Sequence, residues 1–201
     1  MYLTQILIDK TRTRPLKLWD NYGWHRALWH LFPDKNGKER NFLFRVDNLR
    51  TQFKTLLLSE ERPEKQPWGE ISWDTKSVSS DFLSHSIYRF QVRANPTMKK
   101  TFENGNKKRI GIYQETLLND WILRKADQGG FEIDPRYLNI GGAMDESFWI
   151  PDKKQNGMHV SVDFKGILRV IDYPLFEKTF SEGIGSAKAF GYGLLMLQPV
   201  Q

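Results

Sequence analysis

The chain has 201 residues, 39% of them hydrophobic and 13% aromatic, which is enough for one domain or two small ones with packed cores. It contains no cysteine, so disulfides, thiolate metal ligands and a cysteine nucleophile are excluded. Thirty basic and 24 acidic residues give a net charge of +6, an excess too small to identify a partner by itself.

The first half of the chain is expected to contain several strands and one helix. Asn21 is a suitable N-cap for this helix, and Pro33 helps to end it. Residues 59–80 are polar, contain two prolines and are expected to form a loop. The expected elements are a strand at 2–8, a helix from Asn21 to Leu31, and strands at 41–47, 53–58 and 86–92.

The second half again mixes helices and strands. Apolar residues at helical spacing, ended by Gly129-Gly130, predict its first helix, and Asp172 is a suitable N-cap for its second. Strict alternation at 159–164 followed by Lys165-Gly166 predicts a two-residue hairpin turn. The expected elements are a helix at 114–126, strands at 131–133, 159–164 and 167–171, a helix after Asp172, and a strand at 193–198.

These element orders predict an α+β protein with two tandem ferredoxin-like (RRM-like) βαββαβ domains. The first half supplies the order βαββ, and the second half ends in the order ββαβ. We therefore expect an N-terminal domain at 1–92 and a C-terminal domain at 93–201. No sequence repeat relates the two halves.

The helix expected at 21–31 has two faces. One face is apolar and is expected to pack in a core; it carries Trp24, Ala27, Leu28 and Leu31. The opposite face carries Tyr22, His25, Arg26 and Trp29. Histidine can transfer a proton near neutral pH, and arginine can neutralise a phosphate. Taken alone, the second face fits packing of its aromatic residues against a neighbouring loop better than it fits a catalytic site.

A short stretch holds most of the excess positive charge. Between residues 93 and 109, Glu103 is the single acidic residue, and the basic residues are Arg93, Lys99, Lys100, Lys107, Lys108 and Arg109. Such a stripe attracts polyanions, of which a nucleic-acid backbone is the commonest. A solvated loop with incidental lysines explains this stretch equally well.

The segment at 183–199, GIGSAKAFGYGLLMLQP, places four glycines around Lys188, after a helix and before a strand. This order is the reverse of a dinucleotide fingerprint, and the spacing does not fit a P-loop. A small-molecule phosphate enzyme is therefore disfavoured. The glycines permit positive φ angles and a close approach of a large ligand, or they form a plain turn from helix to strand.

Membrane and metal partners are not expected. No apolar run approaches the roughly 18 residues that a membrane span needs, and the N-terminus lacks the layout of a signal peptide. We therefore expect a cytoplasmic location. His25, His30, His85 and His159 are not spaced as an obvious metal site, so neither a metal nor another cofactor is expected.

Three separated stretches resemble the CasE family, the CRISPR repeat-RNA endoribonuclease of the type I-E Cascade complex. YGWHRALWHLFP is similar to the N-terminal Y-x-x-H-x-x-L helix of that family, and VRANPTMKK at 92–100 is similar to its R-A-N-P segment. The segment at 183–199 is similar to its C-terminal glycine-rich signature and is the most specific match. The matches keep their order and nearly their distances from both termini.

The resemblance implies two tandem ferredoxin-like domains that bind a repeat hairpin and cut precursor CRISPR RNA at the 3′ side of its stem. Cleavage would need no metal, because the 2′-hydroxyl next to the scissile phosphate is the nucleophile and a 2′,3′-cyclic phosphate is formed. His25 would act as general base or acid, and Tyr22 would position His25 or the phosphate.

One feature departs from the family pattern, in which a catalytic lysine commonly lies later on the first helix or near the strand at 159–164. Here His30 and Met158 occupy those places. His30, Lys153 or Lys154 are candidates for the missing role, and His159 is a weaker one. We assign the role to His30.

The resemblance also implies an RNA-binding surface. Arg26 is expected at a phosphate, and Arg93, Asn95 and the basic residues at 99–109 are expected along the RNA, with Lys188 near the glycine-rich segment. An A-form stem is recognised mainly by shape and phosphates, which suits a lysine-rich loop. Independently of the resemblance, charge and turn chemistry suggest the hypothesis that the turn DKKQNG at 152–157, with Lys153 and Lys154, enters the groove of the stem as part of a β-hairpin.

The expected partners are the CRISPR repeat hairpin and the other Cascade subunits, namely the backbone and tail proteins. Target DNA would be met only indirectly, through the complex. A second hypothesis is a hairpin-binding subunit of the same complex whose catalysis is weak or lost, because the family lysine is missing.

Overall fold

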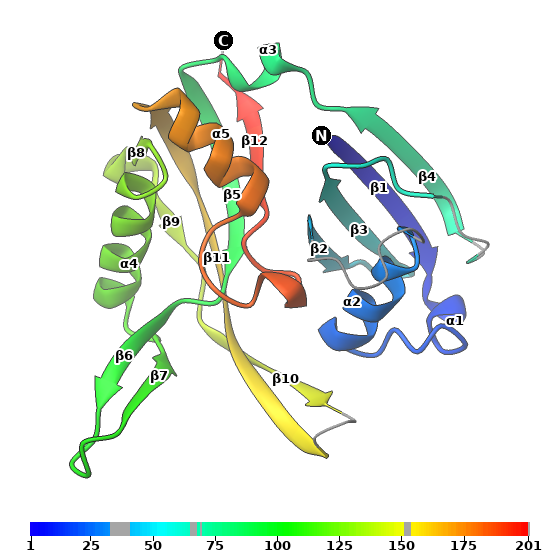
Figure 1. Ribbon diagram of the computed structural model, residues 1–201, viewed down its shortest axis with the longest axis horizontal. Coiled ribbons are helices and arrows are strands. Elements are labelled where there is room, and N and C mark those ends of the chain that lie inside the picture. Colours follow the sequence, from blue (N-terminus) through cyan, green and yellow to red (C-terminus); the bar gives the residue numbers. More distant parts are fainter. Residues whose placement is uncertain (33–40, 65–67, 69, 151–153, 201) are drawn as a thin grey trace.

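The computed structural model describes residues 1–32, 41–64, 68, 70–150 and 154–200. Within them the chain forms two main antiparallel sheets that lie side by side, linked at one end through α3 (Ser80–Leu83) (Figure 1). The predicted α+β class is confirmed.

The first sheet is formed by the N-terminal part of the chain. Its strands lie in the order β2-β3-β1-β4, and every neighbouring pair is antiparallel. Trp24 and Leu28 of α2 share a core with Ile6 and Phe44 of the sheet. The bounds are β1 (Tyr2–Asp9), α1 (Lys10–Thr13), α2 (Asn21–Trp29), β2 (Phe42–Asn48), β3 (Gln52–Ser59) and β4 (Glu70–Ser77).

The second sheet has the strand order β10-β11-β5-β12, and β8 and β9 also pair along β11. Two helices cover one of its faces (Figure 1), where Tyr88, Trp121 and Phe164 are buried. The bounds are β5 (Ile87–Ala94), α4 (Glu115–Asp127), β8 (Phe131–Ile133), η2 (Pro135–Tyr137), β9 (Asn139–Ile140), β10 (Met144–Ile150), β11 (Gln155–Val170), α5 (Tyr173–Glu182), η4 (Lys188–Phe190) and β12 (Leu195–Pro199).

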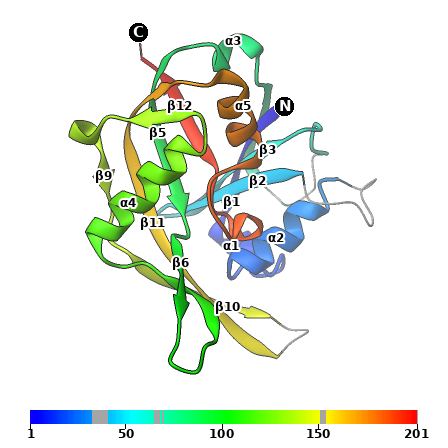
Figure 2. The ribbon, with the colours of Figure 1, turned by 60° about the vertical axis from the view of Figure 1, so that its left-hand side comes forward.

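Two hairpins project from the same end of the second sheet (Figures 1 and 2). The first consists of β6 (Thr97–Thr101) and β7 (Lys107–Gly111). The second consists of β10 and the start of β11, paired from Met144 opposite Ser161 to Ile150 opposite Gln155. Residues 99–109 of the basic stretch and residues 155–157 of the expected groove-entering turn are therefore parts of antiparallel hairpins, whereas Arg93 lies on β5.

Side-chain caps explain where α2 and α5 begin. Asp20 Oδ1 accepts a hydrogen bond from the Gly23 N–H at 2.8 Å, so Asp20 caps α2 in place of the predicted Asn21. Asp172 caps α5 as predicted, because its Oδ1 accepts from the Leu175 N–H at 3.0 Å.

The loop predicted at 59–80 is wrong in its second part, where β4 pairs along β1. Trp73 is partly buried against the first core, and Thr75 Oγ1 lies 3.0 Å from Thr4 Oγ1. An edge strand has one neighbour and tolerates polar residues on its open side. Its composition therefore resembles that of a loop. The described part of the connection from β3 to β4 contains no helix, so this half departs there from the βαββαβ order.

The predicted hairpin turn at Lys165-Gly166 is also wrong, because β11 runs without interruption for 16 residues. Gly166 lies opposite Phe90 of β5. A Cβ at this position would approach the Phe90 ring at 3.0 Å and the Tyr137 carbonyl oxygen at 3.1 Å. A side chain here would push these neighbours apart, so Gly166 serves close packing and not a turn.

The two sheets are in direct contact. The boundary expected after residue 92 falls inside β5, and the whole of β5 pairs with β11 and β12 in the second sheet. Leu43 and Leu58 of the first sheet belong to the core of the second. Apolar side chains of the two sheets therefore pack together, and this contact holds the residues at the junction in position.

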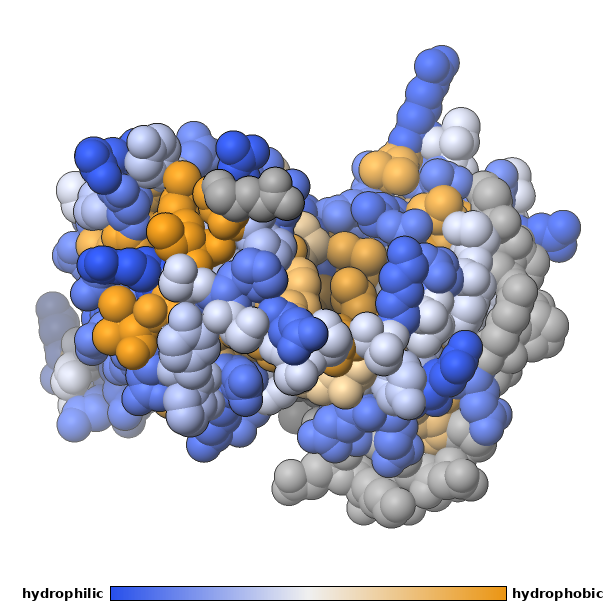
Figure 3. All heavy atoms as spheres, turned by 90° about the horizontal axis from the view of Figure 1, so that it is seen from above, coloured by the Kyte–Doolittle hydropathy of each residue, from blue (hydrophilic) through white to orange (hydrophobic). Residues whose placement is uncertain are grey.

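The end of the molecule opposite the two hairpins is mainly hydrophilic, with separate hydrophobic patches (Figure 3). Among the residues that the structure describes, no helix is long and apolar enough to cross a membrane.

Candidate functional site

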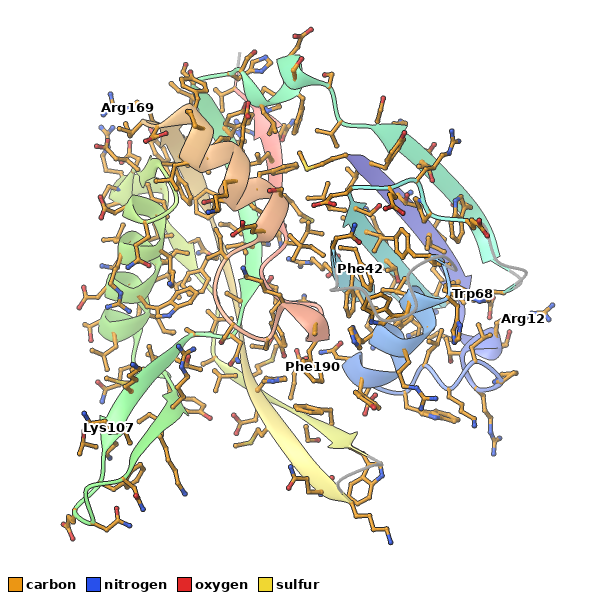
Figure 4. The ribbon with its side chains drawn as sticks, in the orientation of Figure 1. Arg12, Phe42, Trp68, Lys107, Arg169 and Phe190 are labelled. Carbon is orange, nitrogen blue, oxygen red and sulfur yellow. The ribbon has the colours of Figure 1, made fainter. Side chains whose placement is uncertain are left out.

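Phe190 of η4 lies where α2 meets the second sheet (Figure 4). Its ring centroid is 6.4 Å from that of Tyr22 and 6.3 Å from that of His25, both in stacked orientations. On the β10–β11 hairpin, Phe148 and His159 lie 4.6 and 4.8 Å from it. One phenylalanine thus brings the predicted helix face, the glycine-rich segment and the second hairpin together.

His25 is held within this aromatic cluster. Its Nε2 accepts a hydrogen bond from the Trp29 indole N–H at 3.1 Å. An accepting Nε2 carries no proton, so this arrangement corresponds to a neutral imidazole protonated at Nδ1. The sequence placed Trp29 only on the same helix face as His25. The structure shows that its indole sets the orientation and the tautomer of His25.

Tyr22, Arg26 and His30 line a surface pocket of about 350 Å³. Arg26 and His30 are exposed, whereas Tyr22 is half-buried and also stacks on Phe190. The lining of the pocket does not include His25. Tyr22 therefore connects the aromatic cluster around His25 with the pocket that holds Arg26 and His30.

His159 and Met158 lie at the start of β11. Burial lowers the pKa of the His159 imidazole, and the nearby Glu146 carboxylate partly opposes this shift. Met158, which occupies one of the two places where a catalytic lysine was expected, is 62% exposed. The imidazole is packed between Phe148, Phe190 and Tyr192.

Two polar contacts dock the β10 strand on the start of α2. Glu146 Oε2 accepts hydrogen bonds from the Tyr192 hydroxyl at 2.8 Å and from Asn21 Nδ2 at 2.9 Å. Asp20 Oδ2 accepts from the Trp149 N–H at 3.2 Å. Burial and the adjacent Glu146 raise the pKa of Tyr192, which keeps its hydroxyl protonated as a donor.

Glycines form the loop that presents Phe190. Gly183, Gly185, Gly191 and Gly193 all have φ between +77° and +86°. A Cβ at Gly193 would collide with the backbone of Ile184, and one at Gly183 would collide with Gly193 and Leu43. The loop is therefore folded back on itself and packed against the first sheet, so the alternative of a plain turn does not describe it.

Arg93 lies between the two sheets, in an ion-pair cluster that also contains Arg45, Asp47 and Asp163. Its Nη2 lies 3.3 Å from Asp47 and 3.2 Å from Asp163, and its Nη1 donates to the Val46 carbonyl at 2.9 Å. Arg45 reaches the same two carboxylates at 2.9 Å each. Burial alone would raise the pKa of Asp163, but the two guanidinium groups outweigh it and hold that pKa below its usual value.

Asn95 is buried and links three segments. Its Oδ1 accepts from the Val160 N–H at 3.1 Å, and its Nδ2 donates to Ser186 Oγ at 3.3 Å. The Ser186 hydroxyl in turn donates to the Asn95 carbonyl. The R-A-N-P segment thus ties the glycine-rich loop to β11, and its arginine and asparagine both have protein partners.

The other predicted cations of the basic stretch lie on the β6–β7 hairpin and are exposed. Lys99 is opposite Arg109, Lys100 is opposite Lys108, and Lys107 lies at the outer end of β7 (Figure 4). Opposed residues share a face of the hairpin. Each face therefore carries a pair of like charges.

One face of this hairpin completes a pocket of about 270 Å³ lined by four cations, Lys99, Arg109, Arg124 and Lys125, which we call the cationic pocket. Ser186 also lines it, and no carboxylate does so among the described residues. Burial and the charges of Arg124 and Arg109 lower the pKa of Lys125. Sequence reasoning missed Arg124 and Lys125, because basic residues in the last turn of a helix are expected for helix stability alone.

The remaining predicted residues are placed as follows. Lys154 is exposed at the end of the β10–β11 hairpin, and Lys153 lies outside the described residues. Lys188 begins η4 and is half-buried. Within the described part of the chain, no group of histidine, aspartate and glutamate side chains could hold a metal ion.

Comparison with known proteins gives consistent matches over the whole chain. The family described as CRISPR associated protein matches residues 1–199. The CRISPR system Cascade subunit CasE of Escherichia coli K12 is 29% identical over the full length of both chains. The CRISPR-associated endoribonuclease Cse3 of Thermus thermophilus is 25% identical over 99% of this chain and all of its own.

Solved structures agree in fold. The crystal structure of Cas6e from Escherichia coli K-12 has a TM-score of 0.74 at 26% identity, with both chains fully covered. Endoribonuclease Cse3 bound to a 19-nucleotide RNA has a TM-score of 0.82 at 24% identity, covering 99% of this chain and 100% of Cse3.

Proposed function

Because the chain belongs to the CasE/Cse3 (Cas6e) family of CRISPR-associated endoribonucleases, we propose that it processes CRISPR RNA as a subunit of a type I-E Cascade complex. The matches that support this proposal extend over essentially the full length of both the chain and its relatives. One of the similar structures is an endoribonuclease with RNA bound.

The proposed substrate is the hairpin of a CRISPR repeat, cut at the 3′ side of its stem. The 2′-oxygen beside the scissile phosphate loses its proton and attacks phosphorus, while the bond to the 5′-oxygen breaks and that oxygen gains a proton. The products are a 2′,3′-cyclic phosphate and a 5′-hydroxyl. This reaction requires alignment, one proton acceptor, one proton donor and stabilisation of phosphate charge.

The placement of Tyr22 and His25 around Phe190 carries this proposal. His25 transfers a proton, Tyr22 positions the phosphate or His25, and Arg26 neutralises phosphate charge. His30 takes the place of the family lysine, because it is exposed in the pocket that Tyr22 lines, whereas His159 is packed among aromatic rings. His25 Nε2 must give up the hydrogen bond from Trp29 before it receives a substrate proton.

The proposed RNA surface consists of the two hairpins and the cationic pocket. Phosphates of the stem contact Lys100, Lys107 and Lys108 on the first hairpin, and further phosphates enter the cationic pocket. Lys154, at the end of the second hairpin, and the neighbouring Lys153 contact the groove of the stem, and Lys188 lies at the glycine-rich loop. We leave Arg93 and Asn95 out of this surface, because both have protein partners between segments.

A cleavage assay in EDTA tests the reaction. The protein is incubated with its repeat hairpin, either unmodified or with a 2′-deoxy substitution at the nucleotide 5′ of the scissile phosphate. We expect cleavage of the unmodified RNA alone. If both RNAs bind tightly and neither is cut, the protein is a hairpin-binding subunit without nuclease activity. Cleavage of the deoxy RNA would contradict attack by the 2′-hydroxyl.

A further inference from the structure

The pocket that contains Tyr22, Arg26 and His30 also has an aromatic wall, formed by Trp19, Trp68 and Trp149, and we call it the aromatic pocket. Trp19 is 67% exposed and Trp149 is 46% exposed. Tryptophan is usually largely buried, so two exposed indoles beside one pocket are not explained by core packing. The proposed reaction gives them no role.

These indoles are attached to fixed parts of the structure. The backbone N–H of Trp149 donates to Asp20 Oδ2, and Asp20 is the cap of α2. Trp68 packs against Trp73 of β4, with ring centroids 6.4 Å apart. The aromatic wall therefore combines residues from β10, from the chain before α2 and from the connection to β4. Because these segments are far apart in the sequence, no single sequence motif predicts the pocket.

The charges around the aromatic pocket favour a ligand that is both aromatic and anionic. Lys17, Arg26 and His30 supply cationic or protonatable groups. Asp20 is the one carboxylate among the described lining residues, and both of its oxygens accept backbone hydrogen bonds. Indole faces together with cations are the groups that bind an unpaired nucleotide, by stacking on its base and neutralising its phosphate.

We propose that the aromatic pocket binds the unpaired base of the nucleotide that follows the scissile phosphate, stacked against the indoles of Trp19 and Trp149. This inference rests on the proposed function. Bases of the stem are paired and cannot enter a pocket, whereas the first nucleotide after a cut at the 3′ side of the stem is free to do so. Tyr22, shared by the pocket and the cluster around His25, then lies next to the phosphate between the two nucleotides.

Three uncleavable hairpins, each with the 2′-deoxy substitution, test this proposal. The first ends with the scissile phosphate, the second adds one nucleotide, and the third adds one abasic nucleotide. We expect the wild-type protein to bind the second hairpin roughly ten-fold more tightly than the third, as for one stacked base. Trp19→Ala and Trp149→Ala should abolish this preference and bind the first hairpin as the wild type does. Tyr137→Ala, which removes an exposed aromatic ring from η2, should retain it.

The proposal is overturned if the wild type binds the nucleotide and abasic hairpins equally, or if both tryptophan variants keep the full preference. If the protein still binds and cuts the unmodified RNA in such a case, only the proposed role of the aromatic pocket is rejected and the proposed function stands. A protein that neither binds nor cuts the hairpin would instead overturn the proposed function, and this proposal with it.

Discussion

The junction of the two sheets and the outer surface of the second half both concentrate arginine, but in different surroundings. At the junction, the ion-pair cluster places Arg45 and Arg93 between two carboxylates. On the outer surface, the cationic pocket holds four basic side chains and no carboxylate among the described residues. The junction is therefore electrically balanced within the protein, whereas the cationic pocket is balanced only when an anion binds.

This difference separates the residues that build the site from those that hold RNA. At the junction, Tyr22 and His25 of the first half stack on Phe190 of the second half, so these groups are held by contacts between the two halves. The lysines and arginines of the β6–β7 hairpin, together with Arg124 of the cationic pocket, are exposed. Substitutions at the junction should change catalysis or stability, and substitutions on the outer surface should change affinity and its salt dependence.

His25→Ala should give the largest effect. Loss of a general acid or base slows proton transfer, so we expect the cleavage rate to fall by about 10² to 10⁴-fold while hairpin affinity is unchanged. Single-turnover cleavage and a filter-binding titration measure the two quantities. His85→Ala, which removes an exposed histidine near the start of β5, is the matched control. If the His25→Ala protein cuts at the wild-type rate, His25 is not the proton-transfer group and the catalytic site does not lie at the junction.

Arg93→Ala should act on stability. The variant removes one of the two guanidinium groups that face Asp47 and Asp163 and leaves both carboxylates paired with Arg45. We therefore expect a loss of about 3 kcal/mol in the free energy of unfolding, at the low end of the usual range for a broken buried ion pair. The low end applies because the Arg93 side chain is 23% exposed. Urea unfolding measures this loss. Arg89→Ala, four residues earlier on β5 and exposed, is the control. If Arg93→Ala unfolds like the wild type but loses RNA affinity, Arg93 belongs to the RNA surface after all.

Arg93 and Asn95 also show the limits of inference from sequence. A basic stretch indicates positive charge, but it does not indicate which cations face a carboxylate from another part of the chain. Asp47 and Asp163 are 46 and 70 residues away from Arg93 and carry no motif. In the same way, the aromatic residues that contact Phe190 come from three separate segments, α2, β10 and β11. The sequence therefore indicated the helix face and the glycine-rich segment, but it did not indicate that they are in contact.

Local patterns predicted most of the elements. Alternation and helical spacing located β1, α2, β2, β3, α4 and α5 within a few residues. The failures have a common cause: β4 and the middle of β11 depend on tertiary neighbours that override local composition. A polar edge strand resembled a loop, and a glycine required for packing against Phe90 resembled a turn.

The double variant Lys99→Ala/Arg109→Ala should weaken RNA binding without affecting the junction. Each removed phosphate contact should lower the slope of log affinity against log salt by about 0.7 to 0.9, with wild-type stability retained. Hairpin titrations at several salt concentrations give this slope. Lys178→Ala on α5, an exposed lysine near Glu182, should leave it unchanged. An unaltered slope in the double variant would show that the cationic pocket does not hold RNA phosphates.

Asp163→Asn should reveal the smallest effect, a pH dependence of stability that arises at the junction. The pKa of Asp163 is held below its usual value by Arg45 and Arg93, so its contribution is complete above the unfolded pKa of about 3.9 and is lost as the pH falls through the lower folded pKa. We therefore expect the stability difference between wild type and Asp163→Asn to be largest near pH 7 and to shrink below pH 4. Urea unfolding across this range measures it. If the stability difference between the two proteins stays constant with pH, the two arginines do not stabilise the Asp163 carboxylate. The junction would then lack the charge balance that distinguishes it from the cationic pocket.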